Sequence, residues 1–75
     1  MKLTAEEIRI NIGTWMSQLF DNDYHPDDVK KLVEKLSMKI ASYKMKSKDI
    51  TKNIFLDLCK QVENEFNRQT KKNNS

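Results

Sequence analysis

Apolar residues recur every three or four positions in three separate stretches of the chain. These stretches cover residues 8–20, 29–43 and 50–66. Such spacing brings the apolar side chains of each stretch onto one side of an α-helix, whose period is 3.6 residues. The pattern therefore predicts an all-α fold of three amphipathic helices.

Local signals at the helix ends set the expected boundaries. Thr4 followed by Glu7 matches a capping box, in which each side chain binds a backbone N–H at the helix start. Pro26 suits the first position of the second helix, where its missing N–H would be unpaired anyway. Ser47 can cap the third helix, and Lys44-Met45-Lys46 then forms a basic connector before it. The expected helices span about residues 4–21, 26–44 and 48–67.

Two short connections force neighbouring helices to run roughly antiparallel. We therefore expect residues 1–67 to form a small three-helix bundle and residues 68–75, which are polar, to form a flexible tail. So small a core leaves only a few kcal/mol of net stability, and a homodimer would supplement it. The expected core is Trp15, Phe20, Leu36, Ile40, Phe55, Leu58 and Phe66.

Composition agrees with a globular helical chain and indicates its surroundings. Hydrophobic residues make up 37% and charged residues 33%, with one Gly and one Pro. So few chain breakers leave little room for the turns of a β-sandwich or barrel. We expect no membrane span and no signal peptide, because no long apolar run exists and none follows Lys2. The single Cys59 rules out an internal disulfide and favours a cytoplasmic location.

The residue types that catalysis requires are scarce. His25 is the only histidine, no glycine-rich loop could hold a phosphate, and no carboxylate pair has a visible acid–base role. The Asp21-Asn22-Asp23 segment is similar to the opening of a calcium loop, but Leu32 stands where the closing Glu is required. We therefore expect no enzyme activity, no cofactor and no metal site.

Charge is distributed unevenly along the chain. Residues 1–29 carry two basic and six acidic side chains, a net charge of −4. Residues 30–52 carry eight lysines and two acidic side chains, a net charge of +6, and residues 53–75 carry +1. The basic middle third is either a solvated helix face or a binding surface.

The second helix carries the best candidate for a binding surface. Lys31, Lys35 and Lys39 recur one turn apart, with Met38 beside them and roughly opposite the apolar stripe. A basic ridge around an adaptable methionine suits a protein partner with an acidic surface and an apolar pocket. Two more apolar residues lie off their stripes, one on each of the other helices. The candidate partner-binding residues are Lys31, Lys35, Met38, Lys39, Lys46, Ile10 and Leu56.

Nucleic acid is the alternative partner. The lysines continue to Lys52 and could follow a phosphate backbone. Arginine, the residue that most often reads bases, occurs only as Arg9 and Arg68, outside the ridge. A helix-turn-helix fits poorly because the second connection lacks Gly. We therefore expect a small regulator or inhibitor that binds a protein, of the kind that phages and mobile elements encode.

Two families resemble parts of the chain. A helix ending in Gln18-Leu19-Phe20 and a third helix entered through Ser47-Lys48-Asp49 resemble the KIX-type coactivator domain. That resemblance implies a groove between the first and third helices that receives an amphipathic peptide. Residues 29–40 followed by Lys46-Ser47-Lys48-Asp49-Ile50 are similar in rhythm to the helical part of nucleotide-binding ATP cones. The β-hairpin with which such cones hold the nucleotide is absent from the pattern, so nucleotide binding is not implied.

Overall fold

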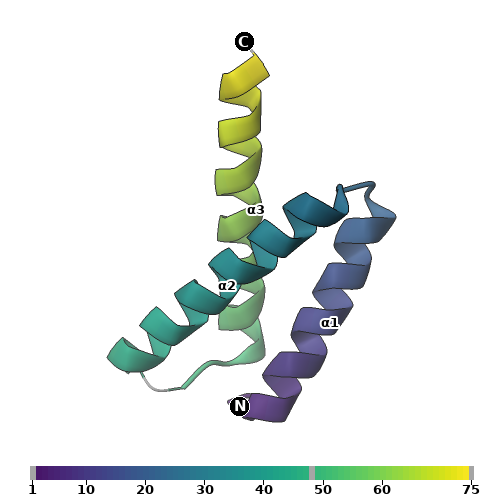
Figure 1. The fold of residues 1–75 in the computed structure, drawn as a ribbon. Helices are drawn as coiled ribbons and strands as arrows, with labels where there is room; N and C mark the ends of the chain where they lie inside the picture. Colours follow the sequence, from purple (N-terminus) through teal and green to yellow (C-terminus); the bar gives the residue numbers. More distant parts are fainter. Residues whose placement is uncertain (1, 48, 75) are drawn as a thin grey trace.

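The protein forms three helices that reverse direction at each connection (Figure 1). The structure is a computed structural model that describes residues 2–47 and 49–74, with the side chains of residues 2–46 and 49–69. Helix α1 spans Ala5–Asp21, α2 spans Pro26–Ser47 and α3 spans Lys52–Asn74. The expected all-α three-helix bundle is confirmed, and the described residues contain no β-strand.

The predicted start of α1 is confirmed in detail. The backbone N–H of Glu7 donates to Thr4 Oγ1 over 3.1 Å, and the backbone N–H of Thr4 donates to Glu7 Oε1 over 2.9 Å. The bond from the Thr4 backbone, followed by the bond from its side chain, lowers the pKa of the Glu7 carboxyl. At α2, Pro26 holds the first position, and His25 Nδ1 accepts the backbone N–H of Asp27 over 3.1 Å. His25 therefore caps this helix.

The second connection differs from the prediction. Lys44, Met45 and Lys46 belong to α2, which continues to Ser47. The third helix begins at Lys52, and Thr51 Oγ1 accepts the backbone N–H of Ile54 over 3.3 Å. The predicted cap at Ser47 is therefore wrong, because Ser47 is the last residue of α2, and Thr51 takes the capping role.

Ile50 explains why the third helix starts late. Its side chain is buried, although it precedes the helix, and its carbonyl accepts the backbone N–H of Leu3 over 2.7 Å. Lys2 and Thr51 form an isolated antiparallel bridge beside this bond. The segment before α1 is thus bound to residues 50–51, directly before α3. At its other end, α3 continues to Asn74, beyond the expected end near residue 67. The flexibility expected of residues 68–75 stays a prediction.

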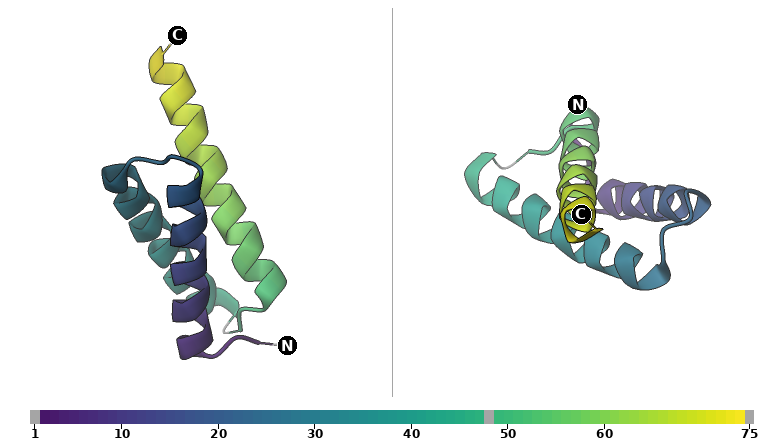
Figure 2. Two further views of the ribbon diagram at one scale, coloured as in Figure 1. Left: turned by 90° about the vertical axis from the view of Figure 1, so that its right-hand side faces the viewer. Right: turned by 90° about the horizontal axis from the view of Figure 1, so that it is seen from above.

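The core lies between α2 and the two other helices, which occupy the same side of α2 (Figure 2). Six of the seven expected core side chains are buried or packed against the core. Phe20 is the exception, and its predicted place in the core is wrong. It lies near the end of α1 and is 46% exposed, whereas the neighbouring Leu19 is buried. The buried apolar residues are Ile8, Trp15, Leu19, Val29, Leu32, Leu36, Ile40, Ile50, Phe55, Leu58, Cys59 and Val62.

Side-chain contacts connect α1 and the segment after it with α3. The indole N–H of Trp15 donates to Glu63 Oε2 over 2.8 Å. Tyr24, which follows α1, places its hydroxyl 3.4 Å from Asn67 Oδ1 and its ring 6.1 Å from that of Phe66. Helices α1 and α3 therefore both pack on α2, and these side-chain contacts also join α1 and the segment after it to α3.

Candidate protein-docking surface

Two methionines lie on the side of α2 that faces away from the core. Met38 is 72% exposed and Met45 is 88% exposed, whereas Leu36 and Ile40 of the same helix are buried. Their separation of seven residues is close to two helical turns, so the two side chains lie along one line of the helix surface. In Figure 1, α2 passes in front of α3 with α1 to its right, so neither helix covers the viewer's side of α2. Exposed apolar groups in such a line are candidates for contact with another molecule.

Lysines flank the methionines on both sides. Lys31 and Lys46 follow one edge of the line, and Lys30 and Lys44 follow the other. All four are exposed, and no described carboxylate lies within 4.0 Å of their ammonium groups. Lysines near the end of α2 also suit the negative pole of the helix dipole. We call this surface the α2 outer face: Lys30, Lys31, Glu34, Met38, Lys44, Met45 and Lys46, in which the exposed Glu34 stands one turn before Met38 and the lysines leave a positive excess.

Two lysines of the predicted ridge lie elsewhere. Lys35 Nζ is 3.8 Å from Glu65 Oε1, and Lys39 Nζ is 3.2 Å from Glu65 Oε2. Both side chains are half-buried at the contact between α2 and α3. Their placement on the outer ridge was therefore wrong, because the flank of α2 that carries them faces α3. One carboxylate between two ammonium groups leaves one positive charge uncompensated at this edge.

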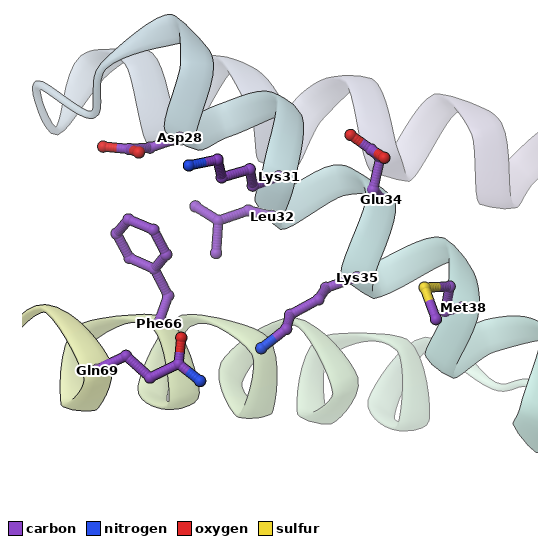
Figure 3. A pocket seen from close by; sticks show the side chains of 8 residues that line it. All are labelled: Asp28, Lys31, Leu32, Glu34, Lys35, Met38, Phe66 and Gln69. Carbon is purple, nitrogen blue, oxygen red and sulfur yellow. The ribbon is translucent and has the colours of Figure 1, made fainter.

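A pocket of about 610 Å³ opens between the first half of α2 and the second half of α3. Figure 3 shows the ring of Phe66 projecting from α3 toward Leu32 on α2. Lys31 and Lys35 contribute two positive charges to the lining, and Asp28 and Glu34 contribute two negative charges. Gln69 and Met38 complete it. The lining is thus neutral, and Met38 joins the pocket to the α2 outer face.

A second, smaller groove of about 270 Å³ separates α1 from α3. Trp15, Phe55 and Cys59 line it, with Leu56, which is 53% exposed, on the α3 side. Ile10 is 63% exposed and stands one turn before Thr14, which also lines the groove. This is the position that the KIX resemblance assigned to a peptide groove. Peptide binding there stays a prediction.

The Cys59 thiol and the His25 side chain are not arranged for catalysis or metal binding among the described residues. Burial, with the negative charge of Glu63 as a smaller contribution, raises the pKa of the Cys59 thiol to about 12. A thiol in that state is a poor nucleophile. His25 accepts a backbone hydrogen bond as a cap. Among the described residues, no group of three or more His, Cys, Asp or Glu side chains is placed to hold a metal ion.

Sequence reasoning missed two parts of this surface. Met45 was assigned to the connector, although its spacing of seven residues from Met38 was a usable signal once α2 extends through it. Glu65 was missed because no local sequence pattern connects it with Lys35 and Lys39, which lie on another helix.

No described helix is long and apolar enough to cross a membrane.

Comparison with models of known protein families, with curated proteins and with solved structures finds no match.

Proposed function

We propose that this chain acts without catalysis, as a small regulator or inhibitor that binds another protein through the α2 outer face. The observation that carries the proposal is the line formed by Met38 and Met45, two exposed apolar side chains flanked by lysines for which no described carboxylate lies within 4.0 Å. The partner surface is acidic and carries apolar side chains.

The energetics of such a contact favour specific but reversible binding. Burial of a methionine side chain contributes at most about 1.5–3 kcal/mol. Methionine is unbranched and polarizable, so it fits partner surfaces of irregular shape. The surrounding lysines accelerate the encounter with an acidic surface and restrict its orientation. Both effects require a partner that combines carboxylates with apolar groups.

The arrangement favours a protein over nucleic acid. A phosphate backbone pairs with lysines but offers no apolar group to the two methionines. The α2 outer face contains no aromatic side chain on which a base could stack. Arg9 and Arg68 lie on α1 and α3. Nucleic acid is therefore the outcome against which the protein hypothesis is tested.

The test uses immobilised protein and an extract of the cells that produce it, treated with nuclease. The wild type should capture a protein partner, and a variant with Met38→Glu and Met45→Glu should lose it. The matched control is Leu56→Glu, because Leu56 is also an exposed apolar residue but lies at the α1–α3 groove. Circular dichroism checks that all variants fold.

Three results would contradict the proposal. Undiminished capture by the double methionine variant would exclude the α2 outer face. Capture that disappears after nuclease treatment, and weakens steeply with salt, would indicate nucleic acid. Loss of capture in the Leu56→Glu variant alone would assign binding to the α1–α3 groove.

A further inference from the structure

We infer that the α2 outer face binds helix α1 of a second copy of this chain. The inference rests on the proposed function and names one acidic, partly apolar partner for the same face. It predicts a head-to-tail contact, in which the basic helix of one copy meets the acidic helix of the next. The sequence supplies both surfaces, since residues 1–29 carry −4 and residues 30–52 carry +6.

Helix α1 presents a continuous exposed strip with acidic ends. Its residues recur every three or four positions and therefore share one side of the helix. Ile10 is the large apolar group of the strip, and the structure leaves it 63% exposed. The acidic ends are Glu6 and Asp21, and neither carboxylate has a described cation within 4.0 Å. We call this strip the α1 outer face: Glu6, Ile10, Gly13, Ser17 and Asp21.

Small residues at the middle of the strip allow close approach. A Cβ atom built on Gly13 would meet nothing within 4 Å beyond its chain neighbours and the backbone of its own helix, so the space above this residue is open. Ser17 stands one turn further along and is also exposed. A side chain from another helix can therefore reach the α1 backbone at this point, as small residues permit in close helix pairs. The flexible side chain of Met38 suits such a site.

The charges of the two faces are spaced alike. Glu6 and Asp21 are 15 residues apart on α1, and Lys31 and Lys46 are 15 residues apart on α2. At 1.5 Å per residue, each pair spans about 22 Å. Two helices placed side by side can therefore join both ends of one face to both ends of the other.

The antiparallel orientation also pairs the apolar groups. In this arrangement Glu6 and Asp21 of one copy lie opposite Lys46 and Lys31 of the other. Residue 10 of the first copy then lies opposite residue 42 of the second. Ile10 then falls between Met38 and Met45, and Met38 lies beside Gly13. A parallel arrangement with the same charge pairing would place Ile10 opposite Lys35. Opposed helix dipoles favour the antiparallel choice as well.

Both faces are open in the same molecule. The residues of both faces are exposed, and α2 in Figure 1 and α1 in the left view of Figure 2 each have one side that no other helix covers. The two faces thus point in different directions, and one copy can use both at once. A heterologous contact of this kind forms rings or open chains. It also occupies the surface that a foreign partner would need.

The test measures self-association of the full chain by sedimentation. A contact made by one helix from each copy belongs to the smallest interface class, so concentrations from about 10 µM to about 1 mM are needed. The average mass of the wild type should rise above 8.9 kDa with concentration. Raising the salt from about 0.05 M to about 0.5 M should weaken the association at least several-fold, because the end charges are exposed.

Two variants separate a head-to-tail contact from other modes. Ile10→Lys disables the α1 outer face, and Met38→Glu disables the α2 outer face, so each should remain monomeric alone. An equimolar mixture should associate again, because each variant supplies the face that the other lacks. Leu56→Lys, on neither face, should behave like the wild type. A wild type that stays monomeric throughout, or an Ile10→Lys variant that self-associates normally, overturns the inference.

A defined probe distinguishes failure of this inference from failure of the proposed function. The probe is the full-length Met38→Glu variant with a fluorescent label, which carries an intact α1 outer face. If this inference is correct, the labelled variant binds the monomeric Ile10→Lys variant and does not bind unlabelled Met38→Glu. If the probe fails to bind while the cell extract still yields a partner that needs Met38 and Met45, only the second-copy inference is overturned.

Discussion

The bond between Trp15 and Glu63 offers a direct test of how α1 and α3 are held together. Trp15 is 5% exposed, and its indole N–H lies 2.8 Å from Glu63 Oε2. Replacing Glu63 by Ala leaves this buried donor without its partner. Such a loss costs about 1–3 kcal/mol, and the charged acceptor places the expected value near 2 kcal/mol. Replacing Glu63 by Gln keeps an acceptor oxygen, so this variant should lose less than about 1 kcal/mol.

In a domain of this size each kcal/mol moves the melting temperature by about 4–8 °C. The Glu63→Ala variant should therefore melt about 8–16 °C below the wild type. Urea unfolding followed by circular dichroism at 222 nm gives the free energy of unfolding. The slope of that free energy against urea should stay unchanged, because the same surface is exposed on unfolding.

A double-mutant cycle isolates the bond from other effects of the substitution. In a Trp15→Phe background no indole N–H remains, so Glu63→Ala should cost at least about 1.5 kcal/mol less than it does in the wild type. The Phe variant also reports the cost of changing the buried ring itself. Equal effects of Glu63→Ala in both backgrounds would refute the reasoning, since the cost would then come from helix α3 alone.

Three further substitutions test other parts of the structure. Thr4→Ala removes the α1 cap and should lower the free energy of unfolding by about 1 kcal/mol, measured by urea titration. Gly13→Ala should raise it by up to about 1 kcal/mol, because the added methyl group meets open space, and a loss would reveal a hidden contact. The pKa of Cys59, raised to about 12 from 9.0, means that the unfolded thiol ionises first. The free energy of unfolding of the wild type should therefore fall, relative to that of Cys59→Ala, as the pH rises from about 8 to about 10. If the two proteins gave parallel curves of this free energy against pH, the raised pKa would be contradicted.

Local sequence signals were sufficient for the helices and for one of the two predicted caps. The Thr4–Glu7 box and Pro26 act within a few residues of themselves, so no knowledge of the fold was needed. The second connection was mispredicted because Ser47 and Thr51 are both acceptable caps. The choice between them depends on Ile50, which is buried and bound to Leu3 at the other end of the chain. A contact across nearly fifty residues cannot be read from local chemistry.

The candidate site was predicted in part for the same reason. Helical spacing placed Met38, Ile10 and Leu56 away from the core, and all three are exposed. Spacing alone could not tell which flank of α2 packs on α3, because that depends on how the helices are arranged around each other. Lys35 and Lys39 lie on that flank and bind Glu65.

The two methionines of the α2 outer face provide a last test, because they separate binding from stability. Met38 and Met45 are not among the buried residues of α2, and Lys35 and Lys39 already pair with Glu65 on α3. Substituting Glu for both Met38 and Met45 should therefore change the free energy of unfolding by less than about 0.5 kcal/mol per site. A loss of more than about 2 kcal/mol would show that these side chains contribute to the fold. Their exposure would then no longer argue for a partner, and both proposals for this face would lose their basis.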